Sequence, residues 1–226
     1  MENLFANISI MLVPALLAVT VHEVSHGYVA DRLGDPTARL LGRLTFNPLR
    51  HLDPIGTLAL LFFGFGWAKP VPVNFRNMQA PKKGMVLVAL AGPMSNFALA
   101  ALFALLLRGL LFVPESVAAG DGALFLEPIS LMAAFGLYIN VILGVFNLIP
   151  IPPLDGGMVM TGLLPEKQAA ILARIEPFGF ILLIFIIFFT DVWRLFLAPL
   201  VFYIVGIFAG PQVVVVDRVM RFLLGH

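Results

Sequence analysis

The sequence contains no cysteine and has few charged residues. Of its 226 residues 12% are charged and 60% are hydrophobic. The lack of cysteine excludes disulfides. Soluble domains carry about 25% charged residues, and half that density cannot cover a globular surface with polar groups. The formal net charge of +1 gives no general affinity for nucleic acid. The composition therefore predicts that lipid surrounds most of the chain.

Several apolar runs approach the length of about 20 residues that a membrane-spanning helix needs. The expected spans are 4–30, 85–113 and 128–149, followed by a helical hairpin formed by 177–190 and 194–210. The run 55–68 is shorter and rich in glycine, which favours a re-entrant or interfacial segment. After it, "KPVPVNF" indicates extended or edge-strand backbone. The prediction is an all-α polytopic membrane protein with about five to six transmembrane helices and a short re-entrant or β-like segment.

The distribution of charge predicts how the chain is oriented in the membrane. Eight of the fourteen Lys and Arg residues lie within 31–84, whereas 114–127 holds three acidic residues and no basic one. The positive-inside rule then places 31–84 and the C-terminus in the cytoplasm, and the N-terminus outside. The first apolar run lacks a basic leader and a cleavage site, so we expect a membrane segment and not a signal peptide. We expect one integral membrane domain over 1–226, with a core at about 4–165 and a hairpin at about 177–210.

Three ionisable side chains interrupt the first apolar run, in the stretch His22-Glu23-Val24-Ser25-His26. On a helix, positions 22 and 26 lie on one face, so both imidazoles can bind a single Zn²⁺, while the adjacent Glu23 can act as general base. Five residues with two variable positions also recur by chance. Ionisable groups cost roughly 2.5–3.5 kcal/mol each within a membrane segment, however, which favours a functional site over a polar cluster between helices.

A catalytic zinc site usually has a third protein ligand, and Asp155 is the best candidate. It follows a predicted span in "NLIPIPPLDGG", where three prolines end regular helix and two glycines permit unusual dihedral angles. Taken alone, this pattern is also typical of a cytoplasmic turn. Asn147, eight residues earlier, could donate a hydrogen bond to an oxyanion or simply cap its helix. For His51 we favour a structural role in its interfacial loop, with a gate as the alternative, and for Asn96 we favour helix–helix packing.

The chain resembles the site-2 protease family of intramembrane zinc metalloproteases. The residues that carry the resemblance are H22-E23-x-x-H26, "NLIPIPPLDG" at 147–156, "GPMSN" at 92–96, and the segments "HLDPIG" and "GWAKPVPVN". The last two are similar to the minimal bacterial and archaeal type, without a PDZ or CBS domain. The resemblance implies that His22, His26 and Asp155 bind one zinc ion, that Glu23 is the catalytic acid–base, and that Asn147 stabilises the transition state or holds the substrate.

The resemblance further implies cleavage of transmembrane protein substrates within the lipid bilayer of a prokaryotic cell membrane. Two other classes of protein use similar residues. A metal transporter would need the same ligands but no adjacent carboxylate, and an inactive relative would bind membrane helices without an intact motif. A transmembrane substrate must also be unwound before cleavage. "KPVPVNF" is either an edge strand that pairs with the substrate through Val71, Val73 and Asn74, or an ordinary interfacial loop.

Overall fold

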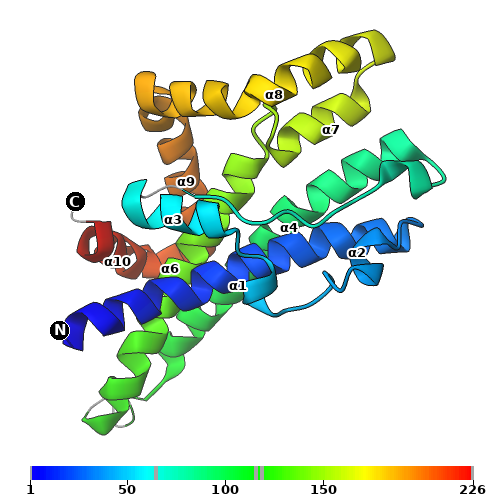
Figure 1. Cartoon of the computed structure of the whole chain (residues 1–226). Helices are drawn as coiled ribbons and strands as arrows, with labels where there is room; N and C mark the ends of the chain where they lie inside the picture. The colour runs from blue at the N-terminus through cyan, green and yellow to red at the C-terminus, as the bar shows by residue number, and fades with distance from the viewer. Residues whose placement is uncertain (1, 64–65, 115–116, 118–119, 225–226) are drawn as a thin grey trace. The chain divides into compact units, whose positions relative to one another are not determined.

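The computed structural model describes residues 2–63, 66–114, 117 and 120–224, which form helices joined by irregular segments (Figure 1). Within this part of the chain five helical stretches are long and apolar enough to cross a membrane, which confirms the predicted all-α polytopic architecture. Four are built on single long helices, namely α1 (Glu2–Arg32), α4 (Pro81–Gly109), α6 (Asp121–Asn147) and α8 (Glu166–Phe189). The fifth, Trp193–Arg221, contains α9 (Ala198–Ala209) and most of α10 (Val213–Leu224).

Several helices are longer than the apolar runs that predicted them. Helix α8 begins at Glu166 and not at 177, and Pro177 lies inside it. Helix α6 likewise begins at Asp121 and includes Pro128. Hydropathy locates only the lipid-compatible part of a helix, whereas good helix formers such as those in "EKQAAILARIE" extend it into polar sequence. The hairpin boundaries expected from hydropathy were therefore too narrow.

The glycine-rich apolar run after the first span forms a short helix, α3 (Pro54–Phe63). Its ten residues extend about 15 Å at 1.5 Å per residue, which is half of the roughly 30 Å needed to cross the hydrocarbon core. Helix α3 therefore adds no span to the five found among the described residues, as expected for a re-entrant or interfacial segment. A buried His51 lies just before it, and its ring Nε2 lies 2.8 Å from the carbonyl oxygen of Thr45.

Residues 69–78, which we call the strap, run in an extended path from Lys69 and end in a 3₁₀ turn at Phe75–Asn77. In the free chain "KPVPVNF" has the extended, loop-like form that was one of its two interpretations, and the described residues contain just an isolated antiparallel bridge between Leu52 and Ala68. Two prolines in the strap have no amide hydrogen to donate. The amide of Asn74 donates instead to the carboxylate of Asp35, at 2.7 Å.

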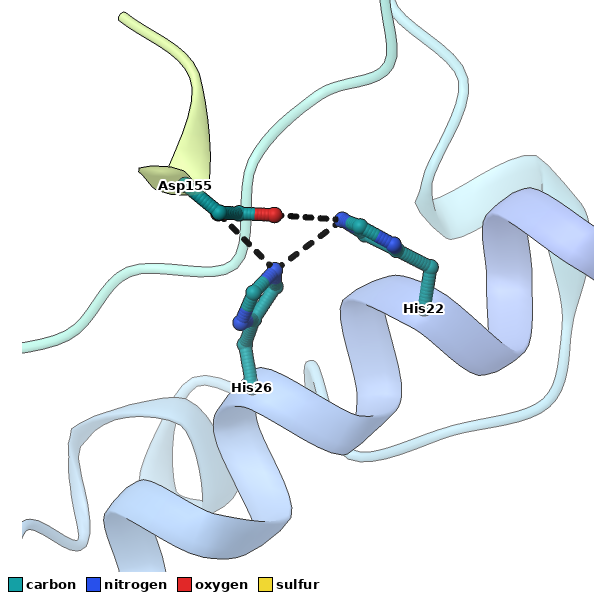
Figure 2. A group of neighbouring side chains, drawn as sticks. All are labelled: His22, His26 and Asp155. Carbon is teal, nitrogen blue, oxygen red and sulfur yellow. Dashed lines mark hydrogen bonds and ion pairs between the residues drawn. The ribbon is translucent and has the colours of Figure 1, made fainter. Parts of the chain in front are cut away.

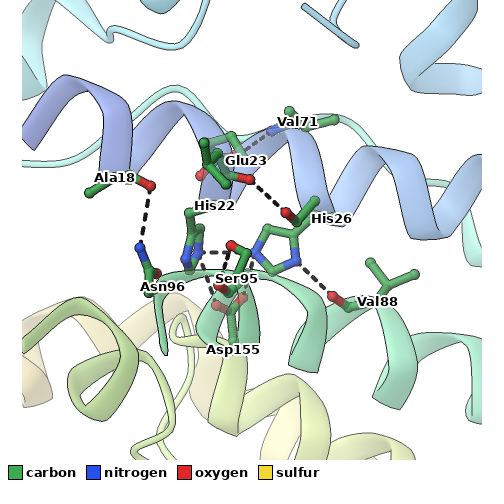
Figure 3. Close-up of polar contacts among 12 residues, drawn as sticks. Ala18, His22, Glu23, His26, Val71, Val88, Ser95, Asn96 and Asp155 are labelled. Carbon is green, nitrogen blue, oxygen red and sulfur yellow. Dashed lines mark hydrogen bonds and ion pairs between the residues drawn. The ribbon is translucent and has the colours of Figure 1, made fainter. Parts of the chain in front are cut away.

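The chain divides into two compact units. Unit 1 contains Met1–Ala18, Asn96–Leu143 and Trp193–His226. Within it Asn96 is fully buried, and its side-chain Nδ2 donates to Asn140 Oδ1 at 2.9 Å and to the Ala18 carbonyl at 3.3 Å. The second of these bonds is shown in Figure 3. These bonds tie α1, α4 and α6 together, as the predicted packing role of Asn96 requires.

Unit 2 contains Val19–Ser95 and Gly144–Val192. It holds the second half of α1, the short helix α2 (Thr37–Leu40), α3, the strap and the first half of α4. It also holds α7 (Asp155–Leu163), which packs against α8 (Figure 1). An apolar cluster of Ala30, Met78 and Val88 joins α1, the strap and α4. All the candidate metal-binding residues lie in this unit.

Candidate metal centre

Helix α1 presents His22 and His26 on the same face, because four residues are little more than one helical turn. Both side chains are buried, with relative exposures of 8% and 9%. Their Nε2 atoms lie 3.0 Å apart, and the two rings meet edge to face (Figure 2). Two buried imidazoles that point the same ring nitrogen at one spot need a shared proton or a common metal ion.

Asp155 reaches the same spot from a different part of the chain (Figure 2). It is the first residue of α7, after an irregular stretch at 148–154 in which the prolines interrupt helix as predicted. Its Oδ2 lies 3.2 Å from His22 Nε2, and its Oδ1 lies 3.3 Å from His26 Nε2. The structure therefore brings together the three residues that the sequence singled out as metal ligands.

The spacing of these three side chains suits zinc. One ligand atom from each lies within 4.8 Å of the others, and the closest separations are 3.0, 3.2 and 3.3 Å. In a tetrahedral site with zinc–ligand bonds of about 2.0–2.1 Å, neighbouring ligand atoms lie about 3.3–3.4 Å apart. Two imidazoles and one carboxylate are also a known ligand set for catalytic zinc, which leaves the fourth position open.

Helix α4 supports the two imidazoles through backbone atoms. The ring Nδ1 of His26 lies 2.7 Å from the Val88 carbonyl oxygen (Figure 3). A carbonyl can only accept, so Nδ1 carries the proton and Nε2 presents its lone pair. One turn further along α4, Gly92 faces both rings, and a Cβ added there would lie 2.4 Å from His26 Nε2 and 2.6 Å from His22 Cε1. Glycine is therefore needed at this position for α4 to approach the histidines.

Glu23 lies beside these residues but is not one of the three grouped ligands. It follows His22 on α1, so its side chain leaves the helix about 100° around the axis. The carboxylate is buried, with 9% relative exposure, and its Oε2 accepts a hydrogen bond of 2.8 Å from the Val71 amide of the strap (Figure 3). Sequence analysis did not anticipate this contact, because a backbone amide carries no residue-type signal.

Asn147 is the last residue of α6 and is partly buried. It therefore lies at the start of the irregular stretch that leads to Asp155. Its position allows either predicted role, as a helix-end cap or as a donor to the substrate. The other histidine considered, His51, takes part in the local loop structure, where its carbonyl also accepts from the Lys69 amide at 2.8 Å.

An apolar cavity of about 550 Å³ lies along α1 within unit 2. The residues that line it from α1 are mostly aliphatic, and the others come from the loop at 44–46 and from Ala91 of α4. Ser25, between Glu23 and His26, is also in the lining, with its hydroxyl donating to the Val21 carbonyl at 2.7 Å.

Comparison with known proteins agrees with this centre. The chain is 39% identical over 191 residues to "Putative zinc metalloprotease YwhC" of Bacillus subtilis (strain 168), covering 84% of each chain. It is 34% identical over 203 residues to "Putative zinc metalloprotease Rip2" of Mycobacterium tuberculosis (strain ATCC 25618 / H37Rv), covering 86% of this chain and 70% of that protein. No solved structure matches the chain.

These relatives and the apolar helices define a class, the membrane-embedded zinc metalloproteases. A family model for Peptidase family M50 matches residues 112–190, a stretch that includes Asn147 and Asp155. The chain belongs to Peptidase family M50, the site-2 protease family, as the resemblance of its motifs predicted. Zinc is the metal that this family membership implies, and the His22, His26 and Asp155 group has the donor atoms to hold it.

Proposed function

We propose that the protein is an intramembrane zinc metalloprotease that hydrolyses peptide bonds in or near transmembrane segments of membrane-protein substrates, as in regulated intramembrane proteolysis. The observation that carries this proposal is the separation of roles at the site. Three side chains converge on one point at zinc-ligand spacing, while the neighbouring carboxylate of Glu23 is held apart from them by the Val71 amide. A protease needs both features, since the ligands hold the metal and the carboxylate moves protons.

In the proposed mechanism His22, His26 and Asp155 hold the zinc ion, and Glu23 is the general base. When bound, zinc polarises the scissile carbonyl and lowers the pKa of a water molecule. With the metal in place, Glu23 would accept a proton from the attacking water at its second carboxylate oxygen, Oε1, and return it to the leaving amine. Asn147 donates its side-chain amide to the oxyanion of the tetrahedral intermediate. The burial of all three ligands keeps bulk water from competing for these groups.

The proposed substrate is a membrane protein with a helical span, because the histidines lie within a candidate span of the enzyme, Ile8–Arg32. A helix encloses its own peptide bonds, so the substrate must unwind locally before cleavage. We further propose one catalytic domain over 1–226 in the cell membrane, with the N-terminus outside and the C-terminus in the cytoplasm. If each of the five candidate spans among the described residues crosses the membrane once, the two ends of the chain face opposite sides, which supports this proposed orientation.

A metal transporter would use the same three ligands, but it has no need of a buried carboxylate beside them. The exchange Glu23→Gln separates the two functions, because it removes the base and keeps every ligand. We expect the purified variant to retain about one zinc per chain and to lose cleavage of a single-span reporter protein whose transmembrane segment contains a central Gly-Pro pair. Zinc content is measured by mass spectrometry of the metal and cleavage by the appearance of both fragments.

Two results would contradict the proposed function. One is cleavage by the Glu23→Gln variant at the wild-type rate. The other is absence of cleavage by the zinc-loaded wild type, together with zinc flux into proteoliposomes that survives the same substitution. Reporters in which a leucine-rich helix replaces the Gly-Pro pair should be cleaved more slowly, since they resist unwinding.

A further inference from the structure

We propose that the strap, residues 69–78, is a positioning element for the general base, in which the Val71 amide orients the Glu23 carboxylate and Asp35 fixes the strap. The proposal rests on the proposed function, because it assumes that Glu23 is the base. It assigns Val71 and Asp35 as positioning residues, which act through Glu23 and not on the substrate.

The position of the Glu23 carboxylate is set by a contact outside its own helix. A glutamate side chain has three rotatable torsions, so a helix alone does not fix its carboxylate. Here Oε2 accepts a 2.8 Å bond from the Val71 amide, and no second hydrogen bond to this carboxylate is found among the described residues. The bond engages one oxygen and leaves Oε1 to accept the proton. Because the donor is a backbone amide, the orientation of the base is only as accurate as the placement of the strap.

On the C-terminal side of Val71 the strap is anchored by Asp35. Asp35 is fully buried between α1 and α2. Its carboxylate accepts bonds of 2.7 Å from the backbone amide of Asn74 and from the side-chain amide of Asn77. It also accepts from the backbone amide of Thr37 at 3.2 Å and from the Thr37 hydroxyl. A buried carboxylate needs such donors to be stable, and in meeting this need it fixes the strap at two points.

On the N-terminal side of Val71 the strap is anchored at Lys69. The Lys69 amide donates to the His51 carbonyl at 2.8 Å, and the Lys69 carbonyl accepts from the Arg43 guanidinium at 2.9 Å. Val71 therefore lies between two fixed points, Lys69 and Asn74. Pro70 and Pro72 flank it and restrict the backbone further, since proline fixes its own φ angle.

The strap also lies in close contact with α1. A Cβ added to Gly27 would lie 2.9 Å from Val71 Cγ1, 2.6 Å from Leu44 Cδ2 and 3.1 Å from the Ala38 Cβ. The absence of a side chain at 27 thus lets Val71 lie against the helix that carries Glu23. Val73 and Phe75 of the strap add apolar contacts with the cluster around Ala30.

The test compares Val71→Pro, which removes the amide donor, with Val71→Ala, which removes the same side chain and keeps the donor. With the Gly-Pro reporter, we expect Val71→Pro to lower kcat about tenfold or more, as loss of a hydrogen bond to a charged group predicts, with KM and zinc content unchanged. Val71→Ala should lower kcat much less than Val71→Pro does, because it removes the side-chain contact with α1 but keeps the amide bond to Glu23. Equal kcat values for the two variants would overturn the proposal.

A double-mutant cycle excludes a merely structural role. If Val71 acts through Glu23, then Val71→Pro should cause little further loss in a Glu23→Asp background, which keeps a carboxylate but is one methylene too short for the Val71 contact, as coupled residues are non-additive. A strap that only supports the fold would lower the residual activity by the same factor in both backgrounds, and this outcome would refute the assignment. Asp35→Asn should lower kcat with zinc retained and should likewise be non-additive with Val71→Pro.

A spectroscopic measurement tests the contact without any cleavage. In zinc-loaded protein labelled with ¹⁵N-valine, the Val71 amide proton should exchange slowly, and Glu23→Gln should shift its resonance upfield. Asp35→Asn should speed its exchange by about tenfold or more, because release of the strap exposes this amide. An unchanged Val71 resonance in both variants would overturn the proposal even if the enzyme were active. Conversely, the proposed function alone would be contradicted if the two variants changed the Val71 amide in this way but the zinc-loaded wild type cleaved nothing.

Discussion

Replacing Gly92 by alanine should separate metal binding from folding. A Cβ at this position would lie 2.4 Å from His26 Nε2 and 2.6 Å from His22 Cε1, whereas ordinary contacts begin at 3.4 Å. The His26 ring must therefore move by about 1 Å, or α4 must retreat by the same distance. Metal sites tolerate about 0.2 Å in their ligand distances, so this displacement removes at least one good ligand.

The expected result is a loss of zinc affinity of about 100-fold or more, the upper end of what disturbed supporting contacts cost. The zinc-free protein should lose little stability, because the roughly 0.5–1 kcal/mol that Gly→Ala contributes in a helix offsets part of the cost of displacing the His26 ring. Zinc affinity is measured by competition with a coloured chelator, and stability by thermal unfolding of the zinc-free protein in detergent.

The matched control is Gly206→Ala in α9, where an added Cβ meets nothing within 4 Å. This variant should bind zinc as the wild type does. Wild-type zinc affinity in Gly92→Ala would refute the reasoning that the close approach of α4 sets the spacing of the two imidazoles. A loss of affinity in Gly206→Ala would show that the effect is not local to the site.

Two further predictions concern the loops. Burial acts to raise the pKa of Asp35, but hydrogen bonds from Thr37, Asn74 and Asn77 outweigh it and hold the pKa below its usual value. The resulting stability is present above the unfolded-state pKa of about 3.9 and is lost as pH falls through the lower folded-state value. Thermal unfolding at pH 6 and pH 3 should therefore show a smaller loss on acidification for Asp35→Asn than for the wild type, and equal losses would contradict this. A single cysteine at Gln79 should react only with a reagent on the cytoplasmic side, and one at Ala119, which is outside the described residues, only from the other side. Labelling of both from one side would contradict the proposed topology.

The sequence predicted those parts of the site that depend on residue type. Two histidines at positions i and i+4 have to share a helix face, and the cost of an acid near the membrane core indicated Asp155 as their partner. The structure places these three side chains together. Its described residues also contain five helical stretches long and apolar enough to be the predicted spans, because apolar runs of that length have few alternatives to a helix in lipid.

The supporting contacts could not be predicted in the same way. The Val88 carbonyl and the Val71 amide belong to the backbone, which is the same at every non-proline residue, so no sequence pattern marks them. Gly92 was noticed within "GPMSN", but its function as a gap for two imidazoles depends on the packing of α4 against α1. Pairing of "KPVPVNF" with a substrate stays a prediction, and nothing in the sequence indicated that two of the amides proposed for it, those of Val71 and Asn74, donate in the free chain to the carboxylates of Glu23 and Asp35.

The convergence of His26 and Asp155 also matters for how the chain is held together. The two residues are 129 positions apart (26 to 155), and this protein has no cysteine with which to join distant segments. In the chain-entropy description, a cross-link that closes a loop of about 100 residues stabilises the folded state by about 4.7 kcal/mol. Zinc held by both residues would act as such a cross-link, reversible and removable by a chelator. Binding of the metal would then stabilise the fold and complete the active site in one event. A chain that lost its zinc would become a better target for degradation.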